Sequence, residues 1–311
     1  MSGDLLSHVG DYLQLRRSLG YKLERDGVVL PRFVKYLVAA RAETITTELA
    51  VSWAQLPEGS SAKLCRDRLI AVRGFAKYMT TIDAATQVPP AGVFGFRANR
   101  PAPYLWSQND IGRLLEAAGR LRSPFRAATY ETFLGLLAVT GLRNGEARDL
   151  QSGDVDLDAG LITINQAKFG RARLIPLHDS TVTKLNDYAR HRDGLHPQPK
   201  SATFFVTDAG TTLKSSNVDR TFGQLIDALA LRTENERPRM HDLRHSFAVR
   251  ALINWHRAGQ DVEARIPALA TYLGHVNPAS TYWYLSASPE LMGLAAARLN
   301  ERFGDRFEGT S

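Results

Sequence analysis

Residues 239–248 read RMHDLRHSFA, and this short polar stretch decides how the rest of the chain is interpreted. On an α-helix, positions i and i+3 lie on one face, so His241 and Arg244 can reach the same group of atoms. Leu243 and Phe247 would then turn into the core. A proton-transferring side chain beside a permanent cation suits a phosphate. The alternative is a solvated helix start, in which the aspartate of the first turn supports the positive end of the helix dipole and the cations are incidental.

Two further stretches also combine a helix end with polar side chains. TGLRNGEARDL at 140–150 follows a strongly apolar run, and a glycine after such a helix lets the chain turn sharply. Arg143 is then presented at the start of a short new helix. In YLGHVNPASTYWYL at 272–285, a helix is expected to stop at the glycine before His275, and Tyr284 follows nine residues after that histidine.

Together, GLRNGEA, HDLRHSFA and LGHVNPASTYWY resemble the motifs of the tyrosine recombinase (phage integrase) family, in the same order. The resemblance covers roughly residue 104 to the end of the chain. It implies a mainly α-helical fold with a small three-stranded antiparallel β-sheet, in which an all-α N-terminal domain and a catalytic domain form a C-shaped clamp on DNA. It also implies an arginine pair, two histidine positions and a tyrosine nucleophile, which are Arg143, Arg244, His241, His275 and Tyr284.

Two more positions match the family. Lys168 lies in the turn of a hairpin predicted at 161–177 and matches the family's mobile lysine. Arg171 and Arg173 are nearby, and a cation at a hairpin tip is usually just solvated. Glu146 matches the acidic residue that usually follows the first arginine, and we interpret it as a group that orients this arginine.

Two residues compete with these assignments. His245 lies one turn from His241, but the order of residues in the motif favours His241, and we expect His245 to face the core. Tyr282 lies about 200° away from Tyr284 around a helix, so both cannot face one phosphate. By the resemblance, the family's nucleophile, counted from His275, falls at Tyr284. The histidines lack a carboxylate or cysteine at metal-ligand spacing, so a metal site is not expected. No cofactor is expected.

Length and composition set the outer bounds. The 311 residues exceed what one hydrophobic core normally supports, so about two domains are expected. The formal charge of +7 favours a polyanionic partner such as nucleic acid. The single cysteine, Cys65, lies on an apolar helical pattern, which predicts a buried thiol and fits a reducing cytoplasm. No secretory signal, membrane-spanning run or lipidation motif is found, so a cytoplasmic protein without a membrane partner is expected.

The chain is predicted to divide into two domains. Residues 1–85 carry four helical patterns and should form a small all-α domain, with helices at 4–19, around 28–37, from 46 or 47 to before Pro57, and at 61–79. By the resemblance this is the core-binding (SAM-like) DNA-binding domain. Residues 86–104 are rich in proline and glycine and are predicted to be a linker. Residues 105–311 would be the catalytic domain, with a C-terminal tail at 288–311.

The second domain contains recognisable helix starts. Ser107 should cap a first helix, with Asp110 completing something close to a capping box. Ser123 followed by Pro124 should start a second helix. Three short antiparallel strands are predicted at 150–156, 161–166 and 173–177. Further helices are predicted near 180–191, 215–230, 240–254, 263–273 and 279–286.

The side chains suit an attack on a DNA phosphodiester. Two arginines remain charged at any working pH and can neutralise the charge that develops on the phosphate. A free tyrosine has a pKa of about 10, so Tyr284 needs this cationic field, or His241 as a base, in order to attack. Lys168 could protonate the departing 5′ oxygen, and His275 could hydrogen bond to the phosphate. The bond energy is retained in a 3′-phosphotyrosyl ester, so neither ATP nor a metal ion is required.

The resemblance implies a site-specific recombinase or integrase that acts on double-stranded DNA with paired recombination sites, and we expect it to serve a mobile genetic element. The alternatives are a type IB topoisomerase-like enzyme, a chromosome-dimer-resolving recombinase and a catalytically inactive DNA-binding regulator. The tail after residue 288 has an apolar stripe, and in recombinases such a tail docks on a neighbour, which favours a homotetramer on DNA. The tail could also simply pack against its own domain.

Overall fold

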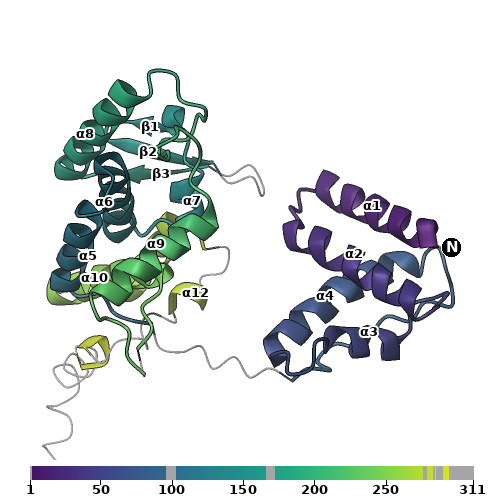
Figure 1. Ribbon diagram of the computed structural model, residues 1–311. Coiled ribbons are helices and arrows are strands. Elements are labelled where there is room, and N and C mark those ends of the chain that lie inside the picture. The colour runs from purple at the N-terminus through teal and green to yellow at the C-terminus, as the bar shows by residue number, and fades with distance from the viewer. Residues whose placement is uncertain are drawn as a thin grey trace, which may run out of the picture. The chain divides into compact units, whose positions relative to one another are not determined.

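The computed structural model describes residues 2–95, 103–165, 172–234, 236–275, 279–282, 284 and 290–293. These residues form two compact units that divide near residue 100, and Figure 1 shows the elements of both, with labels where there is room. The chain is mainly helical with one three-stranded antiparallel sheet, so the predicted fold class is confirmed. Among the described residues, no helix is both long enough and apolar enough to cross a membrane.

The N-terminal unit is a small helical bundle. Thr46 and Ser61 cap its third and fourth helices, because the side-chain oxygen of each accepts a backbone N–H from the first turn. The core is formed by apolar side chains from all of its helices, with Leu30, Phe33 and Phe75 fully buried. The four helices predicted in this part are confirmed as α1 (Ser2–Ser18), α2 (Glu24–Ala39), α3 (Thr47–Ala54) and α4 (Ala62–Met79).

The side chain of Leu64 in α4 is exposed, whereas that of Cys65 is buried. The buried stripe of α4 runs through Leu69 and Val72, and a position one turn before Leu69 is Cys65 rather than Leu64. The prediction of a buried thiol at Cys65 is therefore confirmed.

The C-terminal unit is built around one buried helix, α6 (Pro124–Thr140). Its side chains contact the core on most of its faces, as the apolar run before Gly141 predicts. Ser123 caps it by accepting the N–H of Arg126, and Pro124 occupies the first turn. The other helices of this unit are α5 (Gln108–Gly119), α7 (Asn144–Arg148), α8 (Asp179–Leu195), α9 (Ser215–Ala228), α10 (Met240–Arg257), α11 (Val262–Leu273) and α12 (Ala279–Tyr282).

The sheet has the strand order β1-β2-β3, and both neighbouring pairs are antiparallel. Ile162 pairs with Ile175 across β2 and β3, and both side chains are buried in the core. The turn between these two strands lies outside the described residues. The strands are β1 (Val155–Asp156), β2 (Leu161–Asn165) and β3 (Ala172–Pro176).

The strand predicted at 150–156 is wrong for most of its length. Residues 152–154 form a 3-10 turn, and only the last two residues pair with β2. The chain before this turn pairs with a different segment: the N–H of Phe204 donates to the carbonyl of Leu150 at 2.7 Å, and that of Ser152 donates to the carbonyl of Ala202 at 2.9 Å. These bonds satisfy the backbone groups that a longer β1 would have offered to the sheet.

Three helices meet at Gly141, which ends α6 with a φ of 65°. A Cβ at this position would lie 2.6 Å from Cδ1 of Phe247 in α10 and 3.3 Å from Cδ2 of Leu273 in α11. No side chain can be accommodated there, so the glycine allows a close approach as well as a left-handed turn. The C-terminal ends of α6 and α11 are thereby placed beside the first turns of α10.

The described part of the predicted tail, residues 290–293, packs against the C-terminal unit itself. Leu291 is buried in the same apolar cluster as Leu252 and Ile253 of α10. Glu290 also forms an ion pair with Arg257 at 2.7 Å. For these few residues, the alternative of packing against its own domain is the correct one.

Candidate active site

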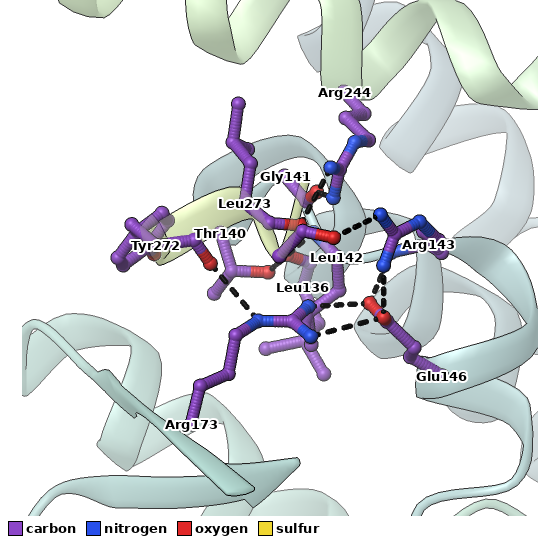
Figure 2. Close-up of polar contacts among 11 residues, drawn as sticks. Leu136, Thr140, Gly141, Leu142, Arg143, Glu146, Arg173, Arg244, Tyr272 and Leu273 are labelled. Carbon is purple, nitrogen blue, oxygen red and sulfur yellow. Dashed lines mark hydrogen bonds and ion pairs between the residues drawn. The ribbon is translucent and has the colours of Figure 1, made fainter. Parts of the chain in front are cut away.

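Arg244 carries a positive charge into the interior of the C-terminal unit. Its side chain is only 2% exposed, so a solvated helix start is not what the structure contains. Nη1 donates to the carbonyl of Gly141 at 2.8 Å, and Nη2 donates to that of Leu273 at 2.6 Å (Figure 2). These carbonyls end α6 and α11, where helical partners are lacking and the helix dipole is negative. Burial and the nearby Arg143 lower the pKa of Arg244 to about 10, so the group remains a cation at neutral pH.

Arg143 lies just before α7 and faces outward from the same place. Its Nη2 donates to the carbonyl of Gly274 at 2.5 Å, next to the carbonyl that binds Arg244. Its Nη1 donates to Oε1 of Glu146 at 2.6 Å, and its backbone N–H donates to Oε2 at 2.9 Å. The side chain is 38% exposed, which leaves part of the guanidinium group open to a ligand. The structure thus brings the two predicted arginines together at the end of α11.

Glu146 is held by a second cation that motif reasoning missed. Arg173 of β3 donates from Nη2 to Oε2 of Glu146 at 2.6 Å and from Nη1 to Oε1 at 3.1 Å. Burial by itself would raise the pKa of Glu146, but hydrogen bonds from Arg173 and from the Arg143 amide, together with both guanidinium charges, hold it below its ordinary value. The sequence contained one signal: Arg173 is in phase with the buried Ile175, and an arginine on the inner face of a strand needs a buried partner.

His275 and Tyr284 lie face to face beside these cations. Nδ1 of His275 is 2.7 Å from the hydroxyl of Thr281, and the ring centroid lies 6.0 Å from that of Tyr284. Burial and the charge of Arg244, followed by that of Arg143, lower the pKa of His275 to about 4. The Tyr284 side chain is 2% exposed, and its phenol raises the pKa of Arg244, so the two groups interact.

The two histidines of α10 also reach this place. His241 is exposed, whereas His245 is half-buried, and their ring centroids are 4.6 Å apart. His245 lies 5.3 Å from the Tyr284 ring, so it borders the site rather than only facing the core as we expected. Packing and the charge of Arg244 lower the pKa of His241, so its ring is neutral at pH 7. The competing Tyr282 is 49% exposed.

Lys168 and Arg171 lie outside the described residues, so the structure carries no geometry for either. Within the described ranges, no group of three or more His, Cys, Asp and Glu side chains is arranged to hold a metal ion. The described cluster therefore consists of guanidinium, imidazole, phenol and carboxylate groups, a set that can bind a phosphate and activate a hydroxyl beside it.

A model of the protein family described as the phage integrase family matches residues 106–290, which include every group of this cluster. The chain belongs to the phage integrase family. The integrase is 44% identical over 306 residues to a Sinorhizobium fredii protein named "Putative integrase/recombinase y4rB", a match that covers 96% of this chain and 98% of the relative. The integrase is thus a tyrosine recombinase, an enzyme that transfers DNA strands.

Solved structures share its fold. A XerH site-specific recombinase bound to a palindromic difH substrate is 19% identical, with a TM-score of 0.65 over 96% of the integrase and 84% of XerH. A lambda integrase tetramer bound to a Holliday junction is 19% identical, with a TM-score of 0.59 over 90% of this integrase and 76% of the lambda chain. At these identities, the likeness extends to the fold alone.

Proposed function

We propose that the integrase is a site-specific recombinase that cuts and rejoins DNA through a 3′-phosphotyrosyl intermediate, in the service of a mobile genetic element. One observation carries the proposal. Arg143 and Arg244 bind adjacent carbonyls at the end of α11, and the buried Tyr284 ring lies beside His275, the residue that follows these carbonyls. A cationic pair and a potential nucleophile are therefore close enough to act on one phosphate. The 44% identity to a relative named as an integrase/recombinase supports the assigned role.

The two arginines are proposed to bind the scissile phosphate. Arg143 is partly open to solvent, and Nε of Arg244 has no hydrogen-bond partner among the described residues. The phosphate gains negative charge in the transition state, and both cations are already fixed by backbone carbonyls, so little reorganisation is needed when the charge develops. His275 would add a hydrogen bond, since its Nδ1 is occupied by Thr281 and its other ring nitrogen remains for the phosphate.

The proposed reaction is an exchange of one phosphoester for another. Oη of Tyr284 bonds to the phosphorus while its proton passes to His241, whose lowered pKa keeps it neutral and able to accept. The bond from phosphorus to the 5′ oxygen breaks, and Lys168 gives that oxygen a proton. The 3′ end of the strand remains on Tyr284 until a 5′ hydroxyl reverses the reaction. Neither ATP nor a metal ion enters this scheme, so cleavage in excess chelator is expected.

The wider assembly also belongs to this proposal. Residues 1–85 are assigned as the core-binding domain, 86–104 as the linker and 105–311 as the catalytic domain, and together they would hold double-stranded DNA. A homotetramer on two paired sites is proposed by analogy with the lambda integrase tetramer bound to a Holliday junction. Because residues 290–293 pack against their own unit, docking on a neighbour is assigned to residues 294–311.

Trapping on DNA tests the nucleophile. Wild-type integrase is incubated with nicked duplex fragments from the genomic region that flanks its gene, so that a cleaved end diffuses away and the covalent complex accumulates. Tyr284→Phe is expected to retain DNA binding in a gel-shift assay and to form no covalent complex. Tyr282→Phe is the matched control, since this exposed phenol lies two residues away, and it should react like the wild type. Covalent capture by Tyr284→Phe would move the nucleophile elsewhere.

A further inference from the structure

Three consecutive carbonyls at the end of α11 bind three different arginines. The carbonyl of Tyr272 accepts from Nε of Arg173 at 2.9 Å, whereas the carbonyls of the next two residues accept from Arg244 and Arg143, respectively (Figure 2). The Arg173 side chain is only 9% exposed, so its charge is largely shielded from solvent. The same short segment of backbone thus positions a third cation with the proposed phosphate-binding pair.

The carboxylate of Glu146 is fully occupied by two of these arginines. Oε1 accepts from Nη1 of Arg143 and Nη1 of Arg173. Oε2 accepts from the backbone N–H of Arg143 and from Nη2 of Arg173. A lysine could supply the charge of Arg173, but not its fork of donors, two of which meet the carboxylate while a third meets a carbonyl.

The charges of the cluster indicate why a third arginine is needed. Glu146 orients Arg143 by pairing with it, and an isolated pair of this kind would cancel the charge that a phosphate should meet. Three guanidinium groups and one carboxylate leave two positive charges in excess. A phosphodiester has one negative charge and gains more as the nucleophile attacks, and an excess of fixed cations stabilises that charge. Without Arg173, these groups would keep an excess of only one positive charge.

We propose that Arg173 is a positioning residue of the integrase active site: it balances the charge of Glu146, which can then hold Arg143 in place without cancelling its field at the phosphate. This inference rests on the proposed function of the site. Arg173 acts through Glu146 and Arg143 and makes no contact with DNA in this scheme. Two consequences can be measured, a slower cleavage step and a changed pH dependence.

Covalent cleavage of the nicked duplex is measured from pH 5 to 8 for Arg173→Gln and Arg173→Lys. Arg173→Gln is expected to cleave about 10- to 100-fold more slowly, by analogy with the loss of a partner that orients a metal ligand. Arg173→Lys should fall between this variant and the wild type. Arg192→Gln is the matched control, since Arg192 is equally buried and also bonds a carboxylate and a carbonyl, but in α8 with Asp193 and Phe204. It should keep the wild-type rate and pH profile at temperatures where it is folded.

The pH profile of cleavage distinguishes a positioning role of Arg173 from a folding defect in the variant. In Arg173→Gln, Glu146 stays buried and loses its largest stabilising partner, so its pKa rises and the acid limb of cleavage moves to higher pH. Among the described residues, the charged groups that interact with Glu146 are Arg143, Arg173 and Arg244. The phenol of Tyr272, whose pKa burial raises to about 12, stays protonated throughout. His241 and His275 titrate in all variants, so the comparison is made between variants.

A second test removes the charges of both Glu146 and Arg173, so that no buried carboxylate is left without its partner. If Arg173 acts through Glu146, the double variant Glu146→Gln with Arg173→Gln should cleave no more slowly than Glu146→Gln alone. A double variant tenfold slower than the single one would overturn the inference, as would wild-type rates and an unmoved acid limb in Arg173→Gln. If the wild type itself forms no covalent complex on Tyr284, it is the proposed function that fails.

Discussion

At the scale of single residues, the site depends on arginine charges that the fold accepts only because backbone partners are supplied. An unpaired charge in the interior costs several kcal/mol, even after the protein relaxes. Arg244 avoids this cost by donating to the carbonyls that end α6 and α11. The same charges act on their neighbours, since burial and then Arg244 and Arg143 bring the pKa of His275 to about 4. One network therefore stabilises two helix ends and keeps this histidine neutral.

This shift predicts how stability depends on pH. As the pH falls from 7, the unfolded chain protonates His275 near its ordinary value of 6.5, whereas the folded protein does so only near 4. Folding stability is therefore lost between these values, by up to about 2 kcal/mol, less than the full shift implies because the ring is partly solvated. The His275→Gln variant lacks the titrating ring, so it should not lose this contribution to folding stability as the pH falls.

The measurement is the free energy of urea unfolding at pH 7 and at pH 4.5 for both proteins. His241, whose pKa is lowered in the same direction, is present in both proteins, so the difference between them reports the titration of His275 together with its coupling to His241. If the difference in unfolding free energy between wild type and variant is the same at both pH values, the predicted titration is contradicted.

At the scale of helices, the site is built at ends rather than along faces. Arg143 begins α7, Gly141 ends α6, and Gly274 ends α11 with a φ of 68°. A glycine in the left-handed conformation ends the helix and leaves its last carbonyls without helical partners. Each of these carbonyls can accept a hydrogen bond from an arginine. The glycines that the sequence marks as stops are thus structural requirements of the proposed phosphate site.

Gly141→Ala should disturb both stability and cleavage. The left-handed backbone costs an alanine about 1–2 kcal/mol, and the Cβ would meet Phe247 at 2.6 Å, so a total loss of about 2–4 kcal/mol is expected. Gly135→Ala is the control in the same helix, where a Cβ would only touch Leu115 at 3.8 Å. It should be neutral or stabilising by about 0.5–1 kcal/mol. Urea unfolding compares the two, and equal stabilities would refute the role of Gly141.

At the scale of the whole molecule, the chain joins two helical units, each with its own apolar core. The formal charge of +7 favours association with DNA whichever parts make contact. The start of the predicted tail belongs to the catalytic unit, because Leu291 lies in the same apolar cluster as Tyr284. Removal of the whole segment from residue 288 would therefore disturb the site itself, and a sharper cut is needed to test docking on a neighbour.

Deletion of residues 294–311 is expected to spare covalent cleavage of a single duplex and to lose recombination between two sites, because only the second reaction requires contacts between protomers. Cleavage is followed by the trapped covalent complex, and pairing by native gel electrophoresis with two labelled duplexes. Leu291→Ala, which keeps the deleted segment but opens a cavity near Tyr284, should instead lower stability by about 2–5 kcal/mol. Undiminished recombination by the truncated integrase would defeat the docking proposal.

The sequence by itself determined the features that depend on residues close along the chain. Serine and threonine caps set the starts of α3 to α6, glycines set the ends of α6 and α11, and three short motifs identified the family. Such signals are readable because a cap, a left-handed turn or a helical face involves neighbours within about four residues. The candidate residues Arg143, Arg244 and Tyr284 came from those motifs, without any indication of what would hold them.

Only the tertiary structure decided the partners. Arg173 and Glu146 are 27 residues apart, and Arg143 and Gly274 are 131 apart, so neither contact leaves a local pattern. For the same reason the strand expected from residue 150 was overestimated, since its backbone bonds go to residues 202–204. Charges buried far apart in the sequence require partners that packing alone brings within reach, and this is why the third arginine of the site became visible only in the folded protein.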